Sequence, residues 1–136
     1  MANIDADDLE INIVHAGTFG NKSVAHKQIN SKPNNGDVLR FFELPAGSTI
    51  YGAHEVHGAL GTGVTMSLGY QPVDGSAADN VAIAAAASVA AAGDSYMAKV
   101  PVVLAKDSYI VGVIGGANAA SAQNVDLVVD YEYRGL

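Results

Sequence analysis

The residues best suited to chemistry in this 136-residue chain are its four histidines, two of which enclose a glutamate in the run His54-Glu55-Val56-His57. A zinc-binding helix carries two histidines four residues apart, with a glutamate as the base. Here the spacing is three, and the surrounding residues are typical of a strand, from which the two imidazoles would project on opposite faces. We therefore expect no metal site, and expect these histidines to make hydrogen bonds at the surface or in an interface.

Other catalytic patterns are missing from the sequence. It contains no cysteine, no G-x-S-x-G elbow and no serine grouped with a histidine and a carboxylate. The glycine-rich run Gly58–Gly63 has no P-loop lysine and precedes a strand pattern, which favours a flexible hairpin connection. Asp5, Asp7 and Asp8 lack the spacing of a calcium loop. We predict that the protein is not an enzyme and binds no cofactor.

Composition narrows the choice of partners. Fourteen acidic residues against seven basic ones give a formal charge of −7, which disfavours nucleic acid. The longest weakly polar stretch, Ala82 to Ala92, is far shorter than the roughly 20 residues that span a bilayer. The acidic amino terminus predicts no signal peptide. Only 15% of residues are charged and 49% are hydrophobic, which suggests that another chain covers part of the surface.

The elements that position these residues follow from an alternation of apolar and polar side chains. The clearest alternating runs are Leu9 to Ile13, Thr62 to Gln71 and Val125 to Tyr133. Further short runs rich in β-branched or aromatic residues span 37–44, 48–57, 98–105 and 108–114. Turn residues separate them. This pattern predicts one all-β domain over residues 1–136, an antiparallel β-sandwich of the jelly-roll kind with about seven or eight strands and at most one short helix.

Two polar segments near the amino terminus do not fit the strand pattern. Residues 1–8 are expected to form a polar arm, which contains Asp5 and Asp7, and residues 18–36 a long loop or extended arm. The loop carries three lysines, Lys22, Lys27 and Lys32. They are candidates for contact with a negatively charged neighbour, or they simply keep the loop soluble.

A third exception is the alanine-rich stretch 77–93. Alanine propensity, Asp79 as a cap and Gly93 as a stop predict a short helix near residues 80–92. Its bulky residues are few, so an irregular crossover whose small side chains let another chain approach closely is an equal alternative. On either reading Ala85 and Ala86 are candidate contact residues.

Parts of the sequence resemble small virion structural proteins of tailed bacteriophages, of the head decoration or cement type. The resemblance is carried by residues 37–50 (DVLRFFELPAGSTI), 59–70 (ALGTGVTMSLGY), 74–77 (DGSA) and 125–133 (VDLVVDYEY). It is one of style and contains no diagnostic motif.

The resemblance implies a sandwich, often a jelly roll, on the outer surface of an icosahedral capsid in the virion. Such proteins form dimers or trimers and clamp adjacent subunits of the major capsid protein. The family has no catalytic residues to carry over. The partners expected on this basis are the major capsid protein and further copies of the chain, with no nucleic acid and no membrane.

Two other functions compete with this interpretation. A carbohydrate-binding jelly-roll module is one, although the chain has no tryptophan and no calcium loop. A fibre or adhesin subunit is the other, in which terminal strands would complete a neighbour's sheet.

Overall fold

The computed structural model describes residues 2–6, 22–97 and 101–133. Within these ranges the chain forms ten strands and no helix, so the predicted all-β class is confirmed and the strand number exceeds the prediction. The strands are β1 (Asn3–Asp5), β2 (Lys22–Ser31), β3 (Val38–Leu44), β4 (Ser48–His57), β5 (Thr65–Pro72), β6 (Asp79–Ser88), β7 (Gly93–Met97), β8 (Val102–Val103), β9 (Ser108–Gly115) and β10 (Gln123–Tyr133).

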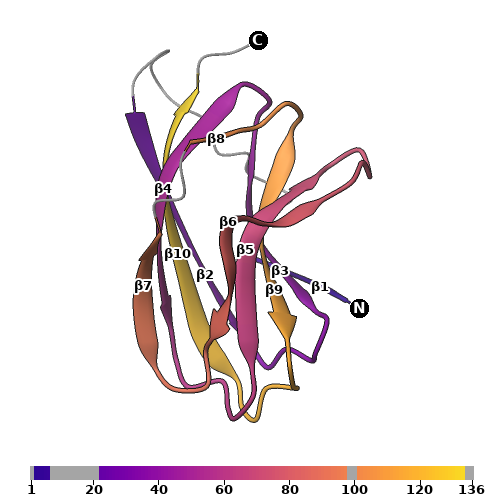
Figure 1. Ribbon diagram of the computed structural model, residues 1–136, viewed down its shortest axis with the longest axis vertical. Coiled ribbons are helices and arrows are strands. Elements are labelled where there is room, and N and C mark those ends of the chain that lie inside the picture. Colours follow the sequence, from indigo (N-terminus) through magenta and orange to yellow (C-terminus); the bar gives the residue numbers. More distant parts are fainter. Residues whose placement is uncertain (1, 7–21, 98–100, 134–136) are drawn as a thin grey trace.

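The strands form two facing sheets, which Figure 1 shows side by side. One has the order β1-β3-β9-β5-β6, and the other has the order β2-β10-β4-β7, with β8 also paired to β4. Every pairing is antiparallel except that of β1 with β3. Without the short strands β1 and β8, two four-stranded sheets remain, with the orders 3-9-5-6 and 2-10-4-7. This is the arrangement of a jelly roll.

The core lies between the sheets and follows the alternation of the strands. On β10, Val125, Leu127, Val129 and Tyr131 are buried, and the residues between them face outward. On β3, both Phe41 and Phe42 are buried, although neighbouring residues of a regular strand face opposite ways. A register shift between Arg40 and Phe42 explains this, because a bulge turns the extra side chain toward the same core.

The prediction of a loop over residues 18–36 is wrong for most of its described part, because Lys22–Ser31 form strand β2. This strand pairs with β10 along its whole length. It lies at the end of its sheet, so only Ala25 and Ile29 need to be buried, and its other side chains can be polar. The apolar alternation that identifies an interior strand is therefore weak in an edge strand.

Both alternatives for the alanine-rich stretch 77–93 are also wrong, because Asp79–Ser88 form strand β6. Alanine favours a helix, but a helix here would bury few bulky side chains. As a strand, the segment instead makes backbone hydrogen bonds to the otherwise unpaired edge of β5, and it buries Ile83. Two register shifts between β5 and β6 accommodate its extra residues.

Smaller differences concern the ends and connections. The run 98–105 contributes only the short strand β8 among its described residues. Gly58–Gly63 joins β4 to β5, which belong to different sheets, so it is a crossover and not a hairpin connection. The predicted strand from Leu9 to Ile13 lies outside the described residues.

Candidate contact surfaces and a buried Glu–His pair

Strand β4 places the two histidines of the His54-Glu55-Val56-His57 run on opposite faces, as the strand spacing predicted. His54 lies on the outer face of the sheet, where its Nε2 is 3.2 Å from Oδ2 of Asp94 on β7. His57 points into the sandwich and is 8% exposed. The two rings cannot bind one ion together, and the described residues contain no group of three or more potential metal ligands.

The pairing of Glu55 with His57 was missed from the sequence. Residues two apart on a strand share a face, and here both side chains are buried, with Glu55 only 3% exposed. Oε2 of Glu55 lies 2.6 Å from Nδ1 of His57, and Nε2 of His57 is 3.0 Å from the carbonyl oxygen of Ala91. The signal in the sequence that could have predicted this pair is a glutamate followed two residues later by a histidine on a predicted strand, because such residues share one face.

The hydrogen bonds of His57 show how this pair is protonated. A carbonyl oxygen only accepts hydrogen bonds, so Nε2 must carry a proton and donate a hydrogen bond to the carbonyl oxygen of Ala91. One further proton then lies between Nδ1 of His57 and Oε2 of Glu55, and the pair is neutral whichever atom holds it. Burial raises the pKa of Glu55, and the hydrogen bond and charge of His57 oppose this shift.

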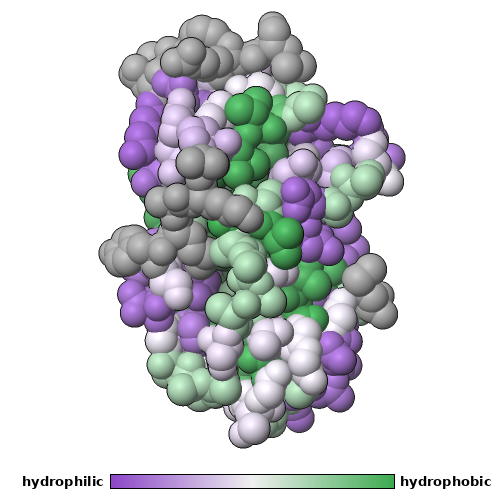
Figure 2. Space-filling model, in the orientation of Figure 1, coloured by the Kyte–Doolittle hydropathy of each residue, from purple (hydrophilic) through white to green (hydrophobic). Residues whose placement is uncertain are grey.

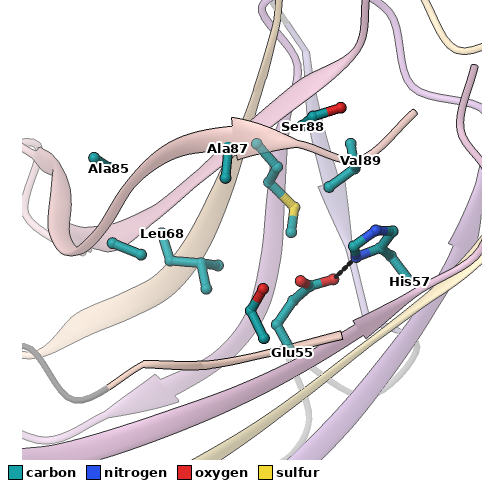
Figure 3. Close-up of a pocket in the computed structure, with 10 residues that line it drawn as sticks. Glu55, His57, Leu68, Ala85, Ala87, Ser88 and Val89 are labelled. Atoms are coloured by element: carbon teal, nitrogen blue, oxygen red, sulfur yellow. Dashed lines mark hydrogen bonds and ion pairs between the residues drawn. The ribbon is translucent and has the colours of Figure 1, made fainter. Parts of the chain in front are cut away.

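Glu55 and His57 lie at the inner end of a pocket of about 260 Å³ between the two sheets. Figure 3 shows them below the strand that carries Ala85 and Ala87. Most of the wall is apolar or small. The lining residues are Glu55, His57, Met66, Leu68, Ala84, Ala85, Ala87, Ser88, Val89 and Ser95.

Strand β6, which forms one lip of this pocket, is also the end of its sheet. Asp79 is the only charged residue in its ten, and Ala85, Ala86 and Ala87 are exposed. Natural edge strands are commonly protected from further pairing by lysine, proline or bulges, and β6 has only the bulges. We call this surface the alanine edge. Figure 2, drawn in the orientation of Figure 1, shows apolar residues along the middle of this face of the molecule.

The three lysines predicted as contact residues lie at or beside β2, the end strand of the other sheet. Lys22 is exposed, and its Nζ is 3.6 Å from Oδ2 of Asp130 on β10. Lys27 is half-buried, on the same side of the strand as Ala25 and Ile29. Lys32 follows the strand and is exposed. We call this surface the lysine edge.

Asp5, one of the two acidic contact candidates, lies on β1 and is bound to Arg40 of β3. Nε and Nη2 of Arg40 donate to its two carboxylate oxygens at 2.6 and 2.7 Å. The guanidinium also stacks on the ring of Tyr109 at 4.4 Å from its centroid. The predicted amino-terminal arm over residues 1–8 is therefore not wholly free of the domain. Its residues Asn3–Asp5 form strand β1, and the two-pronged contact between Arg40 and Asp5 holds β1 against β3. Asp7 lies outside the described residues.

The structure therefore does not bring the candidate residues into one site. β2 contacts β3 and lies near the β1 side, and β6 is at the far end of the sheet that begins with β1. The lysine edge and Asp5 thus lie on one side of the sandwich, and Ala85 and Ala86 lie on the opposite side.

A separate polar cluster holds the turn between β5 and β6. Nζ of Lys106 lies 2.9 Å from Oδ2 of Asp74 and 2.6 Å from Oγ of Ser76. Hydrogen bonds from Ser76 and Lys106 hold the pKa of Asp74 well below its usual range. All three polar groups serve the local turn.

No protein-family model and no curated protein sequence matches the chain. Solved structures do. A chain in the capsid of Ralstonia phage GP4 superposes with a TM-score of 0.76 and 22% identity, covering 98% of this chain and 99% of that one. A chain in the cyanophage Pam1 capsid asymmetric unit gives a TM-score of 0.66 and 15% identity, over 94% and 96% of the two chains.

The fold is therefore one found in phage capsids. A third chain, from the capsid of the Helicobacter pylori bacteriophage KHP30, covers 85% of this chain and 94% of its own length, with 18% identity and a TM-score of 0.59. In contrast, the match in infectious bursal disease virus, at a TM-score of 0.51 and 16% identity, spans 97% of this chain but only 37% of that one. No helix in the described ranges is long and apolar enough to cross a membrane.

Proposed function

We propose that the protein is a virion structural protein that binds the outside of an icosahedral phage capsid and cements adjacent subunits of the major capsid protein. The observation that carries this proposal is the end-to-end match with a chain of the Ralstonia phage GP4 capsid. Because nearly all of both chains superpose, the likeness extends to a whole capsid component. The bursal disease virus match, which covers about a third of that chain, is a likeness to one part of a larger protein.

The two open edges support a clamping role. The lysine edge and Asp5 lie opposite the alanine edge, so one molecule can touch two neighbours at once. Each contact can be weak, because binding at the first raises the effective concentration at the second. We propose the contacts at Asp5, Asp7, Lys22, Lys27, Lys32, Ala85 and Ala86, to the major capsid protein or to further copies in a dimer or trimer.

The net charge supports the outer surface as the location. A chain with a formal charge of −7 would be repelled by packaged DNA inside the shell. On the outside, the shell screens it from that DNA.

The test is to remove the gene from its phage and examine the particles. Cryo-electron microscopy of wild-type heads should show the sandwich on the outer surface, and heads without it should release DNA at lower temperature. Adding the purified chain back should restore both properties. Absence from purified particles, or a position inside the shell or in the tail, would refute the proposal. Glycan binding without capsid binding would favour a carbohydrate-binding module instead.

A further inference from the structure

We infer that the pocket between β6 and β7 is a socket for one lysine or arginine side chain of a neighbouring protein, with Glu55 accepting hydrogen bonds from the cationic group. The alanine walls would enclose the aliphatic part of that side chain. The inference identifies the chemistry of one contact and rests on the proposed function for the identity of the neighbour, a capsid subunit.

The size of the pocket favours a single side chain. Its volume of about 260 Å³ is below the roughly 300–1,000 Å³ of pockets for drug-sized ligands. The mouth is formed by exposed residues with small side chains, Ala85, Ala87, Ser88 and Ser95. A long, thin side chain can enter between them, and its methylene groups can lie on apolar surface while its charged end reaches inward.

Glu55 provides the group that would recognise a donor. One carboxyl oxygen, Oε2, is bound to His57, and the other, Oε1, has no hydrogen-bond partner among the described residues. Figure 3 shows the carboxyl on β4 below Ala87 and Val89, with one oxygen turned toward His57. In a buried site, a carboxylate and a cationic donor form a short, strong hydrogen bond.

The charged groups around Glu55 act on it in opposite directions. His57 and His54 on β4 favour its ionised form, and Asp94 on β7 disfavours it. From β5 and β6, the lining residues are uncharged, and no lysine or arginine lines the pocket in the described ranges. Among the residues that the structure describes, the basic groups near Glu55 are the two imidazoles.

Cation binding would be coupled to proton release. The empty pocket keeps one proton between Glu55 and His57. An ammonium or guanidinium group that binds Oε1 stabilises the carboxylate of Glu55, and release of the shared proton to solvent then requires Oε2 and Nδ1 to separate from their 2.6 Å contact. The pocket would therefore bind the cation more tightly as the pH rises, in contrast to an exposed carboxylate, which is fully ionised at neutral pH.

The isolated protein can be titrated with butylammonium and butylguanidinium chloride at constant ionic strength, with 1-pentanol as the neutral probe. NMR should show saturable shifts of the Ala85 and Ala87 methyl groups and of the His57 ring, with a dissociation constant on the order of 1–10 mM. Affinity should be about threefold higher at pH 8 than at pH 5. Equal binding of pentanol, or no shift with either cation, would overturn the inference.

Two variants separate charge from shape. Glu55→Gln keeps the size of the side chain and should weaken cation binding about tenfold, a loss of roughly 1.4 kcal/mol. Ala87→Leu narrows the mouth, leaves Glu55 intact and should block both cations. Asp74→Asn, in the turn between β5 and β6, removes an equal charge and should leave binding unchanged. Unchanged binding in Glu55→Gln or Ala87→Leu would refute the socket.

The same variants distinguish this inference from the proposed function. If the wild-type chain binds capsids and Ala87→Leu binds them equally well, the socket has no part in assembly, although the cementing role stands. If the wild-type chain binds no capsid, the cementing role fails, whatever the small cations do.

Discussion

Oε2 of Glu55 and Nδ1 of His57 lie 2.6 Å apart within the sandwich, and the other ring nitrogen of His57 donates to the carbonyl oxygen of Ala91. This links β4 to the segment between β6 and β7 through a pair that holds one shared proton. Loss of that proton would leave two hydrogen-bond acceptors facing each other. The pair is therefore sensitive to pH in a way that an apolar contact at this position would not be.

The first prediction concerns Glu55→Gln and stability. Because the pKa of Glu55 is raised above 4.5 in the folded protein, its contribution is fully present below about pH 4.5 and is lost as the pH rises through the folded value. The amide of glutamine can donate to Nδ1 as the protonated carboxyl does. Urea denaturation at pH 4, 6 and 8 should show that the variant loses much of the pH dependence of the wild type.

Glu132→Gln, on the outer face of the same sheet, is the control and should keep the wild-type pH profile. If Glu55→Gln instead loses about 3 kcal/mol or more at every pH, the pair is a buried imidazolium and carboxylate, since removing one charge of such a pair is that costly.

The second prediction concerns Arg40→Lys. Lysine keeps the charge but loses both the two-pronged contact with Asp5 and the stacking on Tyr109. We expect a loss of about 1–2 kcal/mol in the free energy of unfolding, and faster hydrogen exchange at the β1–β3 pairing. If the amide of Ile4 exchanges hydrogen at the wild-type rate in this variant, the contact between Arg40 and Asp5 does not hold β1 in the sheet.

The third prediction concerns Gly69→Ala on β5. A Cβ at this position would overlap the backbone of Asp79 and Asn80 on β6, which cannot move without breaking the pairing. We expect a loss of about 3 kcal/mol or more by thermal or chemical denaturation. Gly75→Ala is the matched control. Gly75 has a positive φ of 85° but open space around it, so only backbone strain of about 1 kcal/mol applies.

The fourth prediction concerns the alanine edge. Ala86 is exposed and does not line the pocket, unlike Ala85 and Ala87 beside it. Ala86→Lys therefore changes the alanine edge without altering the lining of the socket. Its effect on stability should be within about 0.5 kcal/mol. Capsid occupancy, measured by sedimentation with heads, should fall about tenfold because lysine protects an edge from pairing. Val73→Lys, in the turn after β5, should bind as wild type.

The fifth prediction concerns the lysine edge. Lys22→Glu, Lys27→Glu and Lys32→Glu combined should fold and yet bind capsids more weakly, with a loss that shrinks at high salt. Exposed ion pairs such as that of Lys22 with Asp130 add little to stability, so Lys22→Glu alone should cost less than about 1 kcal/mol. Unchanged occupancy of the triple variant would remove these lysines from the interface.

The sequence by itself determined the class of the fold. Alternation in β5 and β10 and the turn residues between the runs predicted an antiparallel sandwich, because one face of each interior strand must be apolar. The opposite projection of His54 and His57 also followed from local geometry alone. These features depend on the period of a strand, which is a property of neighbouring residues.

Only the tertiary structure decided the edges and the pocket. Lys22–Ser31 and Asp79–Ser88 have no local preference for a strand, and they become strands because β10 and β5 each offer an unpaired row of backbone groups. The pocket combines Glu55 of β4 with Ala85 and Ala87 of β6, which meet only when the two sheets pack. Contacts between residues so far apart in sequence depend on the topology, and no local pattern encodes it.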